Sequence, residues 1–404
     1  MNRIVLIGNG FDLAHGLATR YEDFINWYWD QRTQNFSRVY DQVSEDCLCT
    51  FKIDEPYTWK GFYNQIISPL GKPKGKDIIK RIRMKQYGST ISASFTPFFG
   101  NIINSIESKG WVDIENEYYR ELLGCTIVKT SKISLNELNE QFNYITKRLI
   151  EYLSIINSTS TMKVEGIWDN IYSPIKPEDV SIEGRHVIQE CIDEGKSRGL
   201  TYQYHKARQF GIEPKDYIDE IHAYIKGDQK SIPRLYMMPN QIMLLNFNYT
   251  DTSDIYQKHE CSFTIHIHGH ILNPSSIIFG YGDELDENYK ILQALNENEC
   301  LRNIKSIKYL ESDNYRNVLK FLESEPFQVL IMGHSCGNSD RTLLNTIFEH
   351  KNCISIKPFY YKKDEKTDDY LDKVQNISRN FTDMKLMRDR VVNKTYCEPL
   401  PQTK

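Results

Sequence analysis

Histidine and asparagine side chains follow two apolar runs of this chain, where they could carry general-base chemistry. If Phe263–His268 is a strand, its alternation places His266 and His268 together on the face opposite the apolar side chains. A neutral imidazole can take a proton from water or a hydroxyl at pH 7, typically worth about two to four powers of ten in rate. Asn248 follows another run, and its amide can hold that hydroxyl without adding charge.

A glycine-spaced turn follows the first apolar run and could receive a phosphate. Gly8 and Gly10 come directly after Arg3–Ile7, which has the length and composition of a buried parallel strand. A turn without side chains lets an anion approach the backbone, and a helix that begins there points unpaired N–H groups at it. Because a Gly-x-Gly turn is common by chance, an ordinary strand-to-loop turn explains this segment equally well.

The elements that would position these residues divide the chain into three parts. Residues 1–30 form a predicted first strand-turn-helix unit, residues 31–233 have mainly helical periodicity, and residues 234–404 return to alternating strands and helices. The strands predicted in the last part are Ile242–Leu245, Phe263–His268, Ile277–Phe279, Phe327–Met332 and Cys353–Ile356. The helices predicted between and after them are Asp251–Gln257, Glu284–Asn296, Asn314–Leu322, Asp340–His350 and Asp369–Asn380.

This alternation predicts an α/β fold with a Rossmann-like parallel sheet and a large, mainly helical insertion. Ligands of such sheets bind at the carboxyl ends of the strands. The turn at Gly8, Asn248 and His268 should therefore line one crevice.

The middle part offers three further patterns. Ser134 and Glu137 form a capping box before an apolar stripe, and Thr19 with Glu22 forms a similar pattern before the first helix. Acidic residues alternate within Trp111–Tyr119, but the residues that follow favour a helix, which would spread them around its axis, so we predict no paired-carboxylate site there. The basic segment 72–85 is interpreted as a solvated helix face, with nucleic-acid or partner contact as the alternative.

Composition narrows the class of protein. The chain has 404 residues, a net charge of −4 and 26% charged residues, which gives no global attraction to nucleic acid or to an anionic membrane. No apolar stretch approaches the length of a membrane span, and the nine cysteines are scattered. We therefore expect a reduced, cytoplasmic protein with no membrane partner. No metal is expected either, because the only close cysteine pair lacks zinc-site spacing, and the histidine motif has a glycine after His268 and no obvious carboxylate ligand.

The motifs, taken in order, resemble two families. A set of short motifs in the first and last parts looks like the sirtuin-like nucleotide-binding fold: Gly8-Asn9-Gly10, Asn248-Tyr249, His268-Gly269, Ile278-Phe279-Gly280 and Gly333-His334-Ser335. Three segments are similar to the bacteriophage abortive infection AbiH family, over nearly the whole chain: Gly8–Leu17, Trp111–Tyr119 and Gly333–Asp340.

The sirtuin-like resemblance implies NAD, or a related nucleotide, as the substrate. It assigns Asn248 the role of orienting water or a ribose hydroxyl at C1′, and His268 the role of general base. It also implies that the glycine turn lies against the pyrophosphate and the motif from Gly333 near the adenosine ribose. The nucleotide-binding residues implied in this way are Gly8, Asn9, Gly10, Phe11, Asp12, Asp251, Gly269, Gly333, His334 and Ser335.

Departures from the sirtuin-like pattern narrow the expected reaction. Thr250 replaces the expected Asp, with Asp251 one place late, and no paired CxxC motifs are present, so simple NAD hydrolysis is expected rather than protein deacylation. Leu13 stands where a dehydrogenase would have its third glycine. Together with the AbiH resemblance, this implies an antiphage effector that hydrolyses NAD upon a phage-derived trigger. Assembly into a homo-oligomer stays open.

Two other functions remain as alternatives. One is a nucleotide-binding sensor without catalysis, for which Thr250 would mark the lost chemistry. The other is a metal-dependent hydrolase or nuclease that uses His266, His268 and His270 together with the basic segment near Arg81.

Overall fold

A five-stranded parallel sheet forms the centre of the computed structural model, which describes residues 1–71, 73–158, 162–258 and 260–403. Its strand order is β6-β5-β1-β7-β8. The strands are β1 (Asn2–Ile7), β5 (Ile242–Asn246), β6 (Ser262–His266), β7 (Phe327–Met332) and β8 (Cys353–Phe359). The predicted α/β fold with a parallel sheet is thus confirmed.

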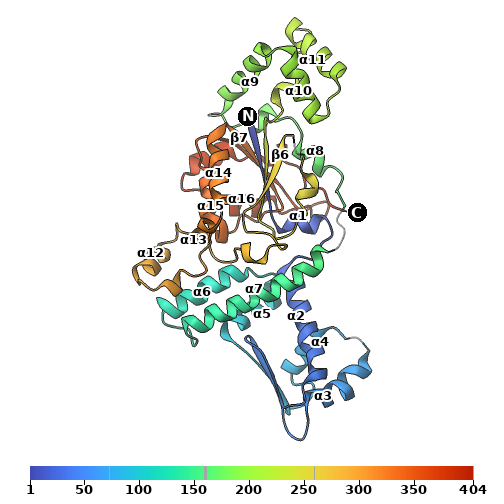
Figure 1. The fold of residues 1–404 in the computed structure, drawn as a ribbon, viewed down its shortest axis with the longest axis vertical. Helices are drawn as coiled ribbons and strands as arrows, with labels where there is room; N and C mark the ends of the chain where they lie inside the picture. Colours follow the sequence, from blue (N-terminus) through green and yellow to red (C-terminus); the bar gives the residue numbers. More distant parts are fainter. Residues whose placement is uncertain (72, 159–161, 259, 404) are drawn as a thin grey trace.

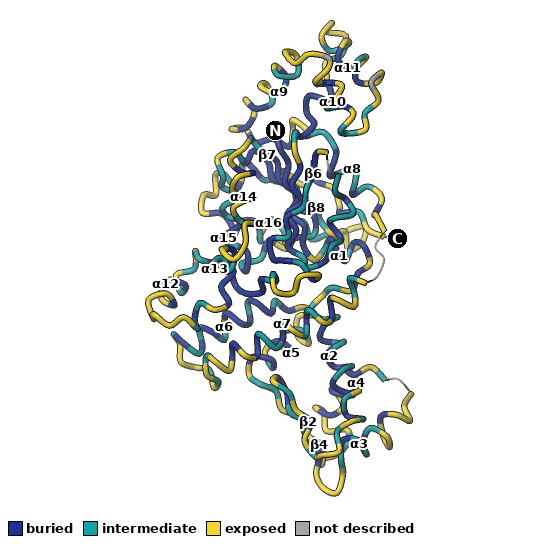
Figure 2. The backbone as a smooth tube through the Cα atoms, viewed as in Figure 1, coloured by how far each residue is buried: buried dark blue, intermediate teal, exposed yellow. Residues whose placement is uncertain are grey.

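Both faces of the sheet are covered, which explains why its strands are continuous apolar runs. Ile4 and Leu6 of β1 pack on one side with residues of α14 (Asn314–Ser324), α15 (Arg341–Phe348) and α16 (Tyr370–Arg379), while Val5 and Ile7 pack on the other with α1 (Asn9–Ala14) and α8 (Ile167–Ile171). Figure 1 shows these two layers of helices on opposite sides of the sheet. Figure 2 shows that the strands of the sheet are buried. The remaining core helices are α12 (Glu287–Ala294), α13 (Lys305–Lys308) and α17 (Met384–Arg390).

Two predicted core elements are wrong. Ile277–Phe279 forms no strand, because Ile278 N–H bonds the His268 carbonyl and the Ile278 carbonyl accepts from the Tyr249 hydroxyl. Asp251–Gln257 forms only a short 3-10 turn, Asp254–Tyr256. The preceding loop is instead held by Asn246, whose Nδ2 donates to the Thr250 carbonyl and to Ser253 Oγ.

Helices α5 (Pro97–Lys109), α6 (Ile114–Thr126) and α7 (Leu135–Asn157) lie across the carboxyl end of the sheet (Figure 1). The capping box of α7 is confirmed, since Ser134 Oγ accepts from Glu137 N–H and Glu137 accepts from Ser134 N–H. The predicted cap at Thr19 is wrong: α2 (Tyr21–Asn35) is capped at Arg20, and the Thr19 hydroxyl donates to Asn9.

The rest of the middle part extends to the two ends of the molecule (Figure 1). One end contains α9 (Arg185–Ser197), α10 (Leu200–Phe210) and α11 (Pro214–Lys226). The other contains α3 (Trp59–Phe62), α4 (Gly75–Arg83) and an antiparallel sheet that the sequence analysis did not predict, formed by β2 (Val43–Glu45), β3 (Cys49–Ile53) and β4 (Ile91–Phe95).

The basic segment is an amphipathic helix, as its pattern suggested. In α4 and the turn after it, Ile78, Ile79 and Ile82 are buried, and the basic residues from Lys74 to Lys85 are exposed. Lys72 lies outside the described residues. Across the part of the chain that the structure describes, no helix combines the length and apolarity needed to cross a membrane.

Candidate functional site

A cavity of about 360 Å³ lies where the carboxyl ends of the strands meet the helices of the middle part. Its core-side wall comes from the segments that follow β1, β5, β6 and β7, and its other wall comes from the start of α6 and from α7. Nine of the predicted site residues line it: Gly8, Asn9, Gly10, Asp12, Asn248, His268, Gly333, His334 and Ser335.

Three predicted residues are not part of the cavity wall. Phe11 is fully buried against His15 and Tyr256. Asp251 accepts a side-chain hydrogen bond from Asn157 of α7, and Gly269 forms a tight turn with φ +83°.

The glycine turn is locked against the turn that follows β7. A Cβ on Gly8 would lie 2.6 Å from His334 Cα, and a Cβ on Gly333 would lie 2.0 Å from Phe11 N. Gly10 N–H donates to the Gly333 carbonyl over 2.9 Å. Close packing of the two turns therefore accounts for these glycines, and the role as a phosphate site stays a prediction.

Asn248 is fixed beside the glycine turn. Its Nδ2 donates to the Gly8 carbonyl over 3.0 Å, and its backbone N–H donates to Asn246 Oδ1 over 2.9 Å. Within the described residues its own Oδ1 accepts no hydrogen bond. That oxygen is therefore available to a water molecule or a ligand hydroxyl.

Asp12 is a buried carboxyl group in the same wall. Its Oδ2 accepts from the Thr250 hydroxyl over 2.7 Å, whereas Oδ1 has no partner among the described residues. Burial raises the pKa of Asp12 to about 6, although the Thr250 hydrogen bond acts against that rise. The group is therefore mostly ionised at neutral pH and has an unused acceptor atom.

His268 is 4% exposed and both of its ring nitrogens face protein groups. Nδ1 lies 3.2 Å from the Phe247 carbonyl, which can only accept a hydrogen bond. Nε2 lies 3.1 Å from the Tyr309 hydroxyl and 3.2 Å from Asp340 Oδ1. Burial, followed by the charge of Lys305, lowers the pKa of His268. The lowered pKa favours the neutral imidazole at pH 7, and Asp340 would stabilise the cation that forms when the ring takes up a proton.

A buried ion network connects this histidine to the middle part of the chain. Lys305 is 1% exposed, and its Nζ lies 2.7 Å from Asp340 Oδ1 and 3.0 Å from Glu115 Oε1. Although burial opposes ionisation, Lys305 and His268 hold the pKa of Asp340 well below its usual range. Burial raises the pKa of Glu115 to about 7. Buried Lys305 therefore links α6 to the core through its ion pairs with Glu115 and Asp340.

Sequence comparison identifies the family. The model of the family described as bacteriophage abortive infection AbiH matches residues 4–361. The chain belongs to the AbiH family. The match includes both walls of the cavity, and AbiH membership supports a role in phage abortive infection. No curated protein and no solved structure matches the chain, and the sirtuin-like resemblance stays a prediction.

Sequence reasoning missed four charged residues of this AbiH site. Asp113 and Glu115 lie in one of the segments that carried the AbiH resemblance, but the helix pattern argued against a paired site there. In the structure Asp113 caps α6 and Glu115 is in its first turn, so both reach the cavity from the end of the helix rather than from its side. Asp340 ends another such segment, whereas no sequence pattern marks Lys305.

The three histidines of the metal alternative do not form one group. Strand β6 ends at His266, so the alternation that placed His266 and His268 on one face does not extend to His268. His268 lines the cavity, whereas His266 bonds Asp254. His270 lies near that pair, and ligand atoms of Asp254, His266 and His270 are all within 4.8 Å of one another.

Proposed function

We propose that this AbiH protein hydrolyses NAD at the bond between ribose and nicotinamide, so that an infected cell stops before phage matures. One observation carries the proposal. The glycine turn, Asn248, His268 and the Gly333 turn, which are far apart in sequence, line a single cavity at the carboxyl edge of a parallel sheet. That edge is where α/β folds of this kind bind nucleotides.

The charge of the cavity suits this reaction. The nicotinamide of NAD is a cationic pyridinium, and it departs as a neutral base, so its departure needs no general acid. The positive charge passes to the ribose, which becomes oxocarbenium-like in the transition state. Asp12 and Asp340 line the cavity and are mostly ionised at neutral pH, and Lys305 pairs with Asp340 there. Fixed carboxylates stabilise a positive charge that develops beside them, and their effect is larger in a desolvated site than in water.

The nucleophile would be a water molecule held by the free Oδ1 of Asn248. Its oxygen attacks C1′ while the electron pair of the ribose–nicotinamide bond leaves with nicotinamide. His268 accepts the water proton on its unprotonated ring nitrogen, and Asp340 pairs with the imidazolium until the proton passes to solvent. The products are nicotinamide, ADP-ribose and one proton.

Asp12 could supply the carboxylate that position 250 lacks, so Thr250 is compatible with NAD hydrolysis. The resemblance expects a carboxylate at position 250, where it would bind the nicotinamide amide. Thr250 instead donates its hydroxyl to Asp12 Oδ2, which brings a carboxylate to the same place from a different segment. We infer that the Asp12 carboxylate recognises the nicotinamide amide once a local shift uncovers its buried, unpartnered Oδ1.

Nicotinamide release by the purified protein tests the proposal. Asn248→Ala and His268→Ala should each lower the rate by about two to four powers of ten, the usual contribution of a general base or of the group that orients its water. His186→Ala, which removes an exposed histidine of α9, is the matched control and should change nothing. Full activity in both cavity variants would overturn the proposed mechanism.

A second candidate is a nucleotide sensor without turnover. The observation that favours it is that His268 is buried with both nitrogens near protein groups. Calorimetry would select this function if NAD binds tightly and remains intact even in the phage-triggered state.

A further inference from the structure

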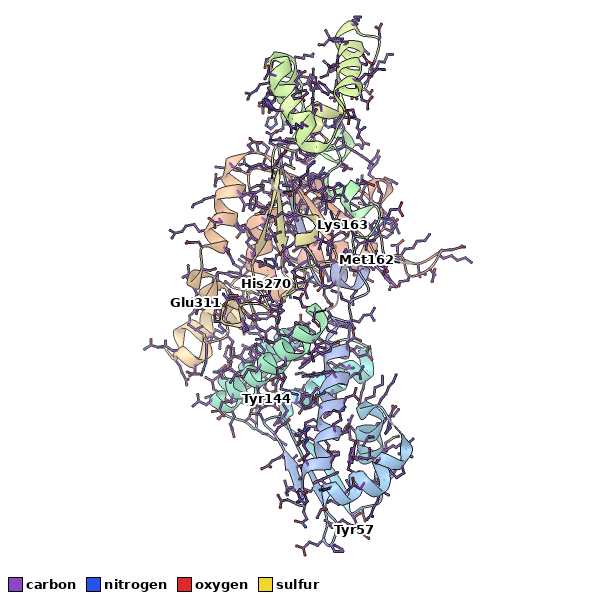
Figure 3. All side chains as sticks on the ribbon, turned by 45° about the vertical axis from the view of Figure 1, so that its right-hand side comes forward. Tyr57, Tyr144, Met162, Lys163, His270 and Glu311 are labelled. Carbon is purple, nitrogen blue, oxygen red and sulfur yellow. The ribbon has the colours of Figure 1, made fainter. Side chains whose placement is uncertain are left out.

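A separate group of metal-binding side chains lies outside the cavity, at the end of β6. His266 is the last residue of that strand, Asp254 begins the 3-10 turn after β5, and His270 follows in the next turn. His266 Nε2 lies 3.2 Å from Asp254 Oδ2, and the His266 and His270 rings are 4.5 Å apart between centroids. Figure 3 shows His270 near the level where the core meets the helices of the middle part.

We propose that Asp254, His266 and His270 bind one divalent first-row transition ion, such as Zn²⁺, and that the ion fixes the loop that carries Asn248. The proposal does not depend on NAD hydrolysis. Two imidazoles and one carboxylate are a donor set for zinc and its neighbours, whereas calcium and magnesium prefer oxygen ligands alone.

The distances are close to those of a tetrahedral site. With metal–ligand bonds of about 2.0–2.1 Å, two ligands of tetrahedral zinc lie about 3.3 Å apart. The His266–Asp254 pair at 3.2 Å already has this separation. The widest pair lies within 4.8 Å, so side-chain rotation would have to close it by no more than about 1.5 Å (4.8 minus 3.3). All three residues are partly exposed, which gives an ion access and leaves a fourth position for water.

Few existing hydrogen bonds oppose binding. Asn246 Nδ2 lies 3.3 Å from His266 Nδ1, but its two hydrogens have better partners in the Thr250 carbonyl and Ser253 Oγ. Whichever nitrogen of His270 binds the ion, Nδ1 gives up the hydrogen bond that it accepts from Leu272 N–H. Leu272 is exposed, so its N–H can bond water instead.

The ion would connect the two loops that carry the proposed catalytic residues. Asp254 lies at the end of the loop that contains Asn248 and Thr250, and His266 lies two residues before His268. The loop is already held at one end by Asn246. A bond from the ion to each loop would hold the other end, so that Asn248 keeps its place beside Gly8.

Metal binding by the full chain tests the site directly. After chelation and dialysis, calorimetry and elemental analysis with Zn²⁺ should give one ion per chain. His270→Ala and His266→Ala should each weaken binding at least tenfold, because losing even a group that hydrogen-bonds a metal ligand typically costs about 10–100-fold. His186→Ala should bind as tightly as the parent protein, and circular dichroism checks that each variant is folded. No bound ion, or unchanged affinity in His270→Ala, would overturn the site.

Two further readouts separate this site from other ligands and from the proposed reaction. Co²⁺ in place of Zn²⁺ should give a visible spectrum without thiolate charge transfer, which excludes the exposed Cys47 as a ligand. Hydrogen exchange of residues 247–253 should slow when Zn²⁺ is added, and unchanged exchange would overturn the role in fixing the loop. Neither readout requires turnover, so a failure of NAD hydrolysis would leave this result unaffected.

Discussion

At the scale of single residues, the cavity wall combines two buried carboxyl groups whose pKa values are shifted in opposite directions because their neighbours differ. Asp340 stays ionised because Lys305 and two histidines surround it, whereas Asp12 has only hydroxyl and amide neighbours and its pKa rises. Groups with shifted pKa values are concentrated at functional sites. Burial of an ionisable group can serve chemistry, but it lowers the stability of the fold. Asp12 should therefore contribute to activity at the expense of stability.

Asp12→Asn should stabilise the protein, and more so as the pH rises. The pKa of Asp12 is about 6 in the folded chain against 3.8 as its ordinary value, so its favourable contribution is complete below about pH 4 and is lost as the pH rises through 6. Asn does not titrate and keeps the neutral form. Urea unfolding from pH 4 to pH 8 should show the variant gaining up to about 3 kcal/mol over the parent protein. A pH-independent difference would contradict the assignment.

The residues that sequence reasoning found are those whose position follows from topology. Asn248 and His268 come after strands, and the carboxyl ends of parallel strands share an edge, so their meeting could be predicted. Lys305 could not be found in this way, since its place depends on the packing of a four-residue helix against α6. The direction of His266 was also missed, because where β6 would end could not be read from alternation.

At the scale of elements, two loops after neighbouring strands support each other. The turn after β1 and the turn after β7 approach so closely that three glycines meet there, and Gly333 has φ +80°. Such contact needs a backbone without Cβ atoms on both sides. The shape of the core-side wall of the cavity therefore depends on the close packing of these glycines.

Gly333→Ala should disrupt this contact far more than a matched change elsewhere. Its Cβ would overlap the backbone of Phe11, whereas Gly110 has a similar φ of +74° with nothing within 4 Å of the added atom. Gly110→Ala should cost about 1 kcal/mol of unfolding free energy through strain alone. Gly333→Ala should cost at least about 3 kcal/mol or prevent folding. Equal losses in thermal or urea unfolding would contradict the packing of the two turns.

Elements were predicted well where the periodic signal was long and poorly where it was short. The five strands of the parallel sheet and α7 carry strong patterns and were found. Strand β3 does alternate, with Cys49, Phe51 and Ile53 buried, but it spans five residues in a region of helical texture. The helix expected after β5 failed because side-chain bonds from Asn246 compete with helical ones.

At the scale of the whole molecule, the cavity lies between the core and the middle part, and Lys305 bonds both. The two outer groups of elements, α9–α11 and β2–β4, lie at opposite ends of the molecule (Figure 1). A ligand in the cavity would thus contact both the sheet edge and α6, and it would stabilise one against the other.

Binding of NAD should slow hydrogen exchange on both walls of the cavity. Protection is expected in residues 8–12 and 333–335 of the core and in residues 111–115 of the middle part. The helices at the far end, residues 185–226, serve as an internal control and should exchange at the same rate with and without NAD. Protection confined to the far helices would contradict the placement of the ligand.

The most direct test measures NAD and nicotinamide in bacteria infected by a phage that the parent protein restricts. The account predicts that NAD falls and nicotinamide rises in cells that contain the parent protein. Cells with Asn248→Ala should keep their NAD and release phage. If the parent protein stops phage growth while NAD stays constant, the cavity does not act by hydrolysing NAD.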